Sequence, residues 1–152
     1  VGLCSMALGL SLQQLNALSE VILINNGGIA EQAAGQALRT IAPPYIEPAL
    51  YYWNRDEQGA SAEVDYVIQQ GNCVIPVEVK AGGTGSMKSL HMFMGLKKSV
   101  VAVRINSDFA SIVDIDLKNN KKKKAKYTLL SIPFYLIEQM PRLLQVYLSK
   151  QK

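Results

Sequence analysis

The stretch EVDYVIQQGNCVIPVEVK, residues 63–80, alternates apolar and charged positions on either side of a turn at Gly71-Asn72. Alternation with a period of two is typical of strands in which successive side chains point to opposite faces of a sheet. The two halves therefore predict paired strands at 63–68 and 74–80, joined by a tight turn.

The acidic residues of these strands occupy defined faces. One face of the first strand is expected to carry Val64, Tyr66 and Ile68. The other face carries Glu63 and Asp65, and in the second strand Glu78 and Lys80 share one face. We expect Asp65, Glu78 and Lys80 to converge, with Glu63 farther along the strand, near the site or in solvent.

This combination points to phosphodiester chemistry. Carboxylates on neighbouring strands are hard oxygen ligands for Mg²⁺, which keeps several waters and shares its remaining positions with a substrate phosphate. A lysine beside them can orient the attacking water and offset charge that builds on the phosphate. The alternative is an ordinary cross-strand ion pair, which contributes about 0.2–1 kcal/mol.

Composition limits the class of protein. With 152 residues and 49% hydrophobic content, the chain is predicted to form one domain with a buried core. A net charge of +4 and a pI near 9.1 are compatible with nucleic acid as a partner. The lysine-rich segment 118–126 is either a solvated loop or a phosphate contact.

Other classes are disfavoured by what the sequence contains. Cys4 and Cys73 lie far apart and His91 is the only histidine, so neither zinc nor a disulfide framework is expected. No apolar run approaches the roughly 20 residues that cross a bilayer. We therefore expect a cytoplasmic protein without a membrane partner, and the missing initial methionine favours the tail of a longer chain.

Periodicity along the chain predicts a mixed α/β fold with a central mixed sheet flanked by helices. A break is expected at 25–28, a turn at 55–60, and a final helix opened by Pro133. Helices are predicted at 8–18, 29–40, 87–96 and 133–148, and strands at 50–53, 63–68, 74–80, 99–104, 111–117 and 127–131.

Two further groups of side chains have open interpretations. The aromatic run Tyr51, Tyr52 and Trp53 belongs either to the core or to a surface that stacks unpaired bases. Lys88, Lys97 and Lys98 lie on or beside the helix after the acidic strands, where they are candidate phosphate contacts.

Once Glu31 in the first long helix is set beside Asp65 and the Glu78-x-Lys80 pair, the chain resembles the PD-(D/E)xK nuclease superfamily. The resemblance implies a restriction-endonuclease-like core, with Asp65 and Glu78 as ligands of Mg²⁺ or Mn²⁺. It implies Lys80 as the catalytic lysine and Glu31 as a further acid. Without the resemblance, Glu31 is equally a helix-start acid favoured by the helix dipole.

A closer resemblance covers nearly the whole chain and rests on AEQ at 30–32, AEVDYVI at 62–68, IPVEVKAG at 75–82 and MKSL at 87–90. These segments look like a C-terminal domain of unknown function that follows an AAA-type ATPase domain in bacterial and archaeal proteins. The resemblance implies a helical extension at 1–25, a nuclease-like domain at 26–152 with additional helices at both ends, and the ATPase as a partner.

Two functions follow as expectations. The first is a metal-dependent nuclease that hydrolyses DNA or RNA, with DNA favoured. The second is a binding module of the same fold, which holds nucleic acid, a protein or its own ATPase half without cutting. The complete set of Asp65, Glu78 and Lys80 favours the first, whereas the modest basicity favours the second.

Overall fold

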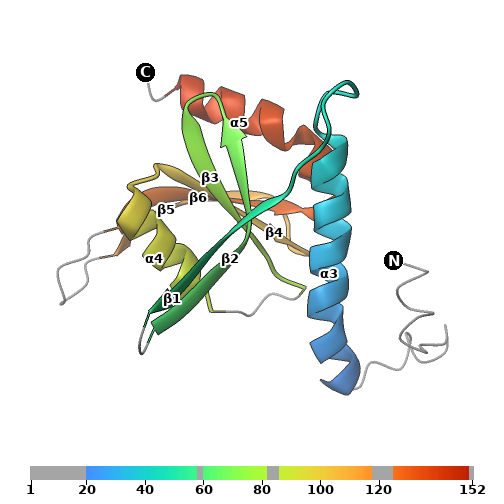
Figure 1. Ribbon diagram of the computed structural model, residues 1–152. Coiled ribbons are helices and arrows are strands. Elements are labelled where there is room, and N and C mark those ends of the chain that lie inside the picture. The colour runs from blue at the N-terminus through green and yellow to red at the C-terminus, as the bar shows by residue number, and fades with distance from the viewer. Residues whose placement is uncertain (1–19, 58–59, 82–85, 118–124, 151–152) are drawn as a thin grey trace.

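The computed structural model describes residues 20–57, 60–81, 86–117 and 125–150, which form a sheet with helices packed on both faces (Figure 1). The predicted α/β class with a mixed central sheet is confirmed. In chain order the described elements are α3 (Glu20–Thr40), β1 (Tyr51–Glu57), β2 (Ala60–Gln70), β3 (Cys73–Val79), α4 (Lys88–Lys97), β4 (Val101–Asn106), β5 (Ser111–Leu117), β6 (Ala125–Pro133), the 3-10 helix η1 (Phe134–Gln139) and α5 (Met140–Ser149).

The described strands form a sheet in the order β1-β2-β3-β4-β6-β5. β1, β2 and β3 pair antiparallel, β3, β4 and β6 run parallel, and β5 returns antiparallel to β6. The helix α4 connects β3 to its parallel neighbour β4, as a parallel pair requires. The carboxyl ends of β3, β4 and β6 therefore meet at one edge of the sheet, which we call the carboxyl edge.

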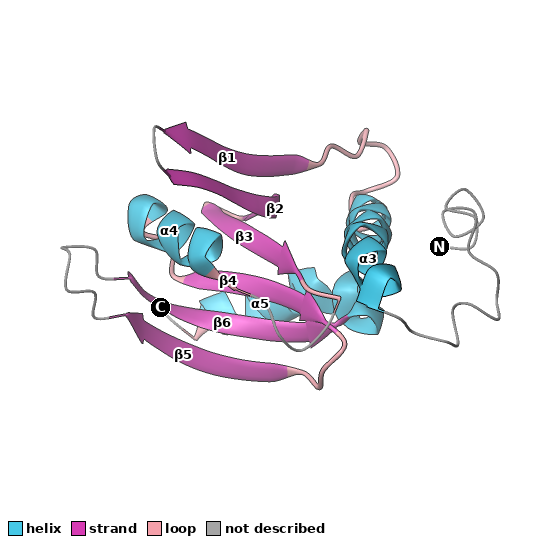
Figure 2. Ribbon diagram, turned by 90° about the horizontal axis from the view of Figure 1, so that it is seen from below, coloured by secondary structure: helices cyan, strands magenta, loops and turns pink. Residues whose placement is uncertain are grey.

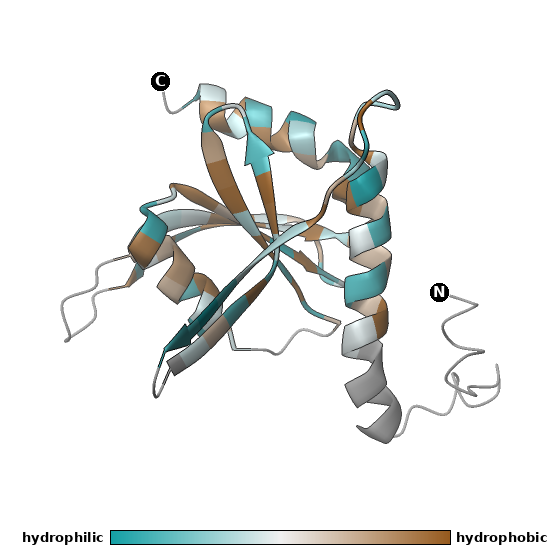
Figure 3. Cartoon of the chain, in the orientation of Figure 1, coloured by the Kyte–Doolittle hydropathy of each residue, from teal (hydrophilic) through white to brown (hydrophobic). Residues whose placement is uncertain are grey.

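Helices lie on both faces of the sheet (Figure 2), and each face has its own apolar core. On one face, Ile75, Val77 and Val79 of β3 pack with α3, η1 and α5. On the other face, α4 contributes Leu90, Phe93 and Met94 to a second cluster. β3 is hydrophobic along most of its length (Figure 3), which is typical of a strand covered on both faces.

β2 contains an irregularity that the alternation rule does not anticipate. Trp53 pairs with Val64 and Tyr51 pairs with Val67, so β2 has two residues, Asp65 and Tyr66, opposite one residue of β1. Such a bulge shifts the alternation by one position. Val64 is fully buried in the α4 cluster. Tyr66, like Ile68, packs instead on the α3 side of the sheet. The prediction that Val64, Tyr66 and Ile68 share a face is wrong for this reason.

The first long helix is longer than predicted. α3 begins at Glu20 and runs through 25–28, where the sequence analysis placed a break and a domain boundary. Gly27 and Gly28 have no positive φ and are accommodated in the helix at a modest cost in stability. The helix predicted at 8–18 lies outside the described residues. No helix in the described ranges is long and apolar enough to cross a membrane.

Two other boundaries also differ. β1 continues to Glu57, so the turn expected at 55–60 is shorter. Pro133 does not open the last α-helix: it ends β6 in an extended conformation and precedes η1. The proline in the first turn of α5 is Pro141. Proline does occupy the first turn of the last α-helix, as the sequence rule predicts, but the residue is Pro141 and not Pro133.

Candidate functional site

Glu78 and Lys80 lie at the carboxyl edge, at the end of β3. Glu78 pairs in register with Arg104 of β4 and is 4% exposed. Its Oε1 lies 2.6 Å from Lys80 Nζ, and the Lys80 side chain is 25% exposed. The ion pair therefore joins a buried carboxylate to a cation that still reaches solvent.

Asp65 is brought to the same place by the bulge in β2. Its Oδ2 accepts a hydrogen bond at 2.7 Å from the backbone N–H of Val79, which stands between Glu78 and Lys80 in the chain. Since regular β2–β3 pairing ends at Tyr66 and Val77, the aspartate side chain takes the place of the next ladder partner. The convergence of Asp65 with the Glu78–Lys80 pair is thus built into the strand pairing.

Glu31 reaches the site from α3 and is exposed. The Tyr66 hydroxyl donates a hydrogen bond at 2.9 Å to the backbone carbonyl of Glu31. This contact needs Gly35, one turn further along α3, because a Cβ there would lie 2.5 Å from the Tyr66 hydroxyl oxygen. Tyr66 and Gly35 therefore set how closely Glu31 approaches the sheet.

The charges of this group act on one another. Burial raises the pKa of Glu78, and Asp65 and Glu31 raise it further, while Lys80 opposes the rise. Burial raises the pKa of Glu31 as well, followed by the charge of Asp65. The pKa of the Tyr66 hydroxyl is also raised, first by burial and then by these acids. The site therefore holds more negative charge than Lys80 offsets.

Buried polar atoms without a hydrogen-bond partner gather at the same edge. Among the described residues they are Glu78 Oε2, Arg104 Nε, Asn106 Oδ1 and Ser131 Oγ. Glu78 pairs in register with Arg104, and Arg104 with Ser131, so these side chains share the face that α4 covers. Buried polar groups normally find partners. Their grouping at the ends of three adjacent strands is a feature that sequence reasoning missed.

A signal for this polar strip was present in the sequence. In VAVRIN and TLLSIP, Arg104, Asn106 and Ser131 interrupt apolar strands near their ends. Polar side chains in a strand covered on both faces need a partner or a function. Periodicity alone assigns such interruptions to strand ends, so it does not single out Arg104, Asn106 and Ser131 as site residues.

The site offers few acidic side chains that could act as metal ligands. Within the ranges that the structure describes, no three side chains of His, Cys, Asp and Glu gather closely enough to hold a metal ion. Asp65 and Glu78 remain as a pair of carboxylates, with Glu31 at the rim. Mg²⁺ is commonly bound through one or two carboxylates together with water and substrate oxygens.

The three candidate lysines on α4 separate into two locations. Lys88 begins α4, which follows the carboxyl edge in the chain. Lys97 and Lys98 lie at the opposite end of the helix, where Ser99 Oγ donates a hydrogen bond at 2.8 Å to the carbonyl of Val74, near the start of β3. The structure therefore does not bring Lys97 and Lys98 to the carboxylates.

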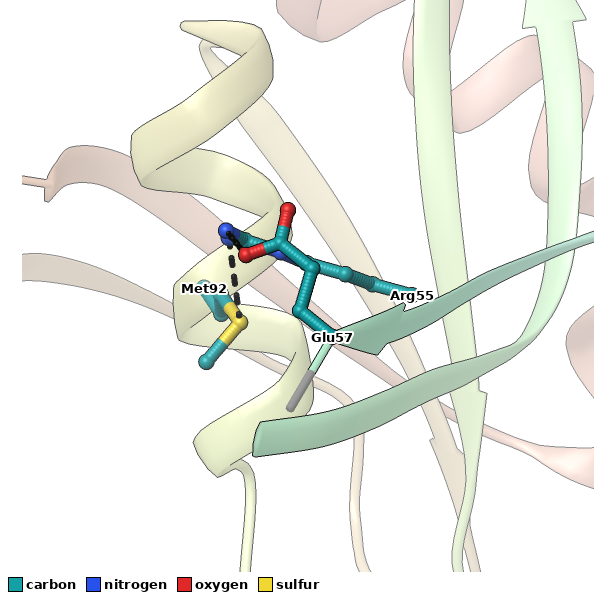
Figure 4. A network of polar contacts seen from close by, with 3 residues as sticks. All are labelled: Arg55, Glu57 and Met92. Carbon is teal, nitrogen blue, oxygen red and sulfur yellow. Dashed lines mark hydrogen bonds and ion pairs between the residues drawn. The ribbon is translucent and has the colours of Figure 1, made fainter. Parts of the chain in front are cut away.

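Other contacts fix α4 on the sheet. Arg55 of β1 pairs with Glu57, and its Nη1 lies 3.8 Å from the Sδ atom of Met92 on α4 (Figure 4). His91 Nδ1 lies 2.7 Å from the hydroxyl of Tyr127 on β6. Burial lowers the pKa of His91 and raises that of Tyr127 to about 12. The contact with Tyr127 therefore gives His91 a structural role, in which it holds α4 against β6.

No curated protein matches the chain. Residues 26–135, which include α4 and every candidate acid, match a family described as a domain of unknown function, DUF4143. Because the match covers more than half of the chain, the protein belongs to the DUF4143 family.

Proposed function

We propose that this domain is a divalent-metal-dependent nuclease with its centre at Asp65, Glu78 and Lys80. The proposal rests mainly on the environment of the Glu78 carboxylate. This carboxylate is buried, one of its oxygens has no partner, and neighbouring acids oppose its ionisation. A cation beside Asp65 and Glu78 would satisfy the free oxygen and relieve the repulsion.

The residues present fit Mg²⁺ or Mn²⁺. Asp65 and Glu78 supply two hard oxygen ligands from adjacent strands, and the remaining positions suit water and a substrate phosphate. When bound, such an ion lowers the pKa of a water molecule and offsets charge on the phosphoryl oxygens. Asp65 is held in place by the Val79 N–H, so little side-chain freedom is lost when it binds.

Lys80 is suited to act on the substrate. Its ammonium is partly exposed and pairs with Glu78. From this position it can stabilise negative charge on a phosphate or hold the attacking water. Glu31, which is exposed at the rim, would orient water or complete the acidic set. Lys88 remains a candidate phosphate contact, whereas Lys97 and Lys98 are too far along α4 for the same phosphate.

The resemblance to PD-(D/E)xK nucleases supports the same proposal. We assign the sheet with α3 and α4 to a restriction-endonuclease-like core, because Glu31, Asp65 and Glu78-x-Lys80 lie on the elements that this superfamily uses. The resemblance to domains that follow AAA-type ATPases supports a nuclease that acts in tandem with an ATPase domain, in the cytoplasm, with DNA as the favoured substrate.

A second candidate function is a nucleic-acid-binding module that does not cut. One observation favours it: the described residues offer only a pair of close carboxylates, with the third acid at the rim. In this version the Glu78–Lys80 pair serves to hold the end of β3. The two candidates differ in whether a metal binds and whether a phosphodiester bond is broken.

The test is calorimetric titration of Mg²⁺ and Mn²⁺ into the purified chain, with cleavage of plasmid and branched DNA scored on the same preparations. We expect saturable binding that is lost in Asp65→Asn, and cleavage that is lost in both Asp65→Asn and Lys80→Ala. Glu138→Gln, which changes an exposed acid on η1, is the matched control. Metal binding without cleavage, or cleavage that persists in the variants, would reject the nuclease.

A further inference from the structure

A cleft of about 560 Å³ lies at the end of the sheet opposite to the carboxyl edge. Its walls come from the start of β1, the β2–β3 turn, the end of α4 and the segment that leads into β4. Among the lining residues are Tyr51, Tyr52, Trp53, Phe93, Lys97 and Lys98. The cleft is therefore separate from the carboxylates but uses the same helix and the same strand β3.

The aromatic residues at this cleft range from exposed to buried, and Phe93 belongs to the α4 core. Tyr51 and Tyr52 are 66% and 67% exposed. Trp53 is half-buried and packs edge-on against Phe93 at a centroid distance of 5.3 Å. Of the two interpretations that the sequence left open, a core position holds for Trp53 in part and fails for the tyrosines. Exposed aromatic faces grouped at a cleft favour a ligand that stacks.

The charge of the cleft is positive. Lys97 and Lys98 are both exposed, and no Asp or Glu is among the residues that line it. Lys98 has φ 52° and ψ 33°, the left-handed conformation in which glycine or asparagine normally ends a helix. A lysine there costs about 1–2 kcal/mol relative to glycine. A side chain kept at such a position is a candidate for function.

We propose that this cleft binds single-stranded DNA, with unpaired bases on Tyr51, which shares the α4 side of β1 with Trp53, and phosphates near Lys97 and Lys98. Aromatic side chains combined with a cationic groove are the general means of holding unpaired strands without sequence preference. The stacking surface discriminates against a duplex, whose bases are not available. The charge discriminates against an apolar peptide.

This inference deepens the proposed function. It rests on that function only for the step after binding, in which the bound strand would be cut at the candidate centre. Val74 at the cleft and Glu78 at the carboxyl edge are four residues apart along β3, or about 13 Å. At ~3.4 Å per stacked nucleotide, the cleft would hold a strand about four nucleotides from the candidate centre. Binding itself needs neither a metal nor Glu78.

The single tryptophan of the chain provides the readout. Oligothymidylate of about ten nucleotides is titrated into the full chain in EDTA, and into the Glu78→Gln variant under the same conditions. We expect saturable quenching of Trp53 fluorescence in both proteins. A duplex of the same length should bind more weakly, by about tenfold or more.

Two variants test the two halves of the cleft. Tyr51→Ala is expected to weaken binding about five- to hundredfold, from the known range for base stacking. Lys98→Gly keeps the left-handed backbone and removes the charge, so the slope of log K against log salt should become less steep by about 0.7. Tyr135→Ala and Lys150→Ala, which change exposed residues elsewhere, are the matched controls.

Several results would overturn the inference. They are the absence of quenching, equal affinity for duplex, binding of thymidine monophosphate as tight as that of the oligonucleotide, and unchanged affinity in Tyr51→Ala. Because the titration contains no metal and includes Glu78→Gln, its failure is independent of cleavage. Conversely, tight binding without any cleavage in the presence of Mg²⁺ would support the cleft and reject the nuclease.

Discussion

The Asp65 carboxylate accepts a hydrogen bond from the N–H of Val79, so the candidate aspartate of one strand is fastened to the backbone between the candidate glutamate and lysine of the next. The separation of Asp65 from Glu78 and Lys80 is therefore set by main-chain geometry. This link has consequences for stability as well as for metal binding.

Asp65→Ala should destabilise the domain by about 1.5–3 kcal/mol, because a part-buried hydrogen bond to a charged group is lost. Asp65→Asn retains an acceptor oxygen and should lose less than half as much. The measurement is urea unfolding in EDTA, where metal does not contribute. Equal losses in the two variants would show that the hydrogen bond is not what stabilises this edge.

Glu78→Gln should stabilise the metal-free domain at alkaline pH. The pKa of Glu78 is raised in the folded state, mainly by burial, so its contribution to stability is fully present below the unfolded value of 4.5 and is lost as the pH rises through the folded pKa. The neutral amide avoids that loss. Thermal unfolding at pH 4.5 and pH 8 in EDTA checks the sign, at about 2–4 °C per kcal/mol.

The addition of Mg²⁺ supplies the complementary test of Glu78. Wild type should gain in Tm as the metal binds the folded state, by RT ln(1 + [L]/Kd), and Glu78→Gln should not. An increase of equal size in the two proteins would place the metal elsewhere. A Gln variant less stable than wild type at pH 8 in EDTA would show that the ion pair with Lys80 outweighs the burial of the carboxylate.

Two glycines of α3 should respond in opposite directions to alanine. A Cβ at Gly28 has no atom within 4 Å, so Gly28→Ala should stabilise the helix by about 0.5–1 kcal/mol. At Gly35 the Cβ would strike the Tyr66 hydroxyl, and Gly35→Ala should cost about 1–3 kcal/mol. Chemical unfolding of both variants is the measurement. Stabilisation by both would mean that α3 does not pack on Tyr66 as described.

His91 should titrate below its ordinary pKa of 6.5, because burial disfavours the charged imidazolium. Below that value the unfolded chain binds a proton that the folded chain does not, so His91 makes stability fall as the pH decreases through this range. Since the chain has one histidine, its ring protons give a single NMR titration curve. A midpoint at or above 6.5 would contradict the burial of His91 beside Tyr127.

The fold class and the spacing of Glu78 and Lys80 could be read from the sequence because both follow from strand periodicity. The bulge at Asp65-Tyr66 could not, since one extra residue in β2 leaves the hydrophobic pattern almost unchanged while it alters which face each side chain occupies. The approach of Asp65 to Glu78 was nevertheless predicted, because the two residues adjoin Tyr66 and Val77, a regular pair of β2 and β3 that the bulge toward β1 leaves in place.

The other errors also have local causes. Gly27 and Gly28 indicate a break, but two helical glycines cost less than a 21-residue helix gains by continuing. Lys97 and Lys98 seemed close to the site because α4 follows it in sequence, yet ten residues of helix carry them about 15 Å away. The grouping of the buried polar atoms Arg104 Nε, Asn106 Oδ1 and Ser131 Oγ was missed because the register of their strands is a tertiary property.

The bulge also determines how this strand can change during evolution. Deletion of one residue from β2 near Val64 would leave a regular ladder with β1, and a regular ladder is ordinarily the easier one to form. Loss of Asp65 would restore regular alternation with Val64 still on the α4 core and Tyr66 on the α3 side, but it would remove the carboxylate that accepts the Val79 N–H. Deletion elsewhere in β2 would turn the side chains on one side of the deleted position to the opposite face. We therefore expect β2 to accept substitutions more readily than changes of length, and an alignment of relatives to be free of gaps across this strand.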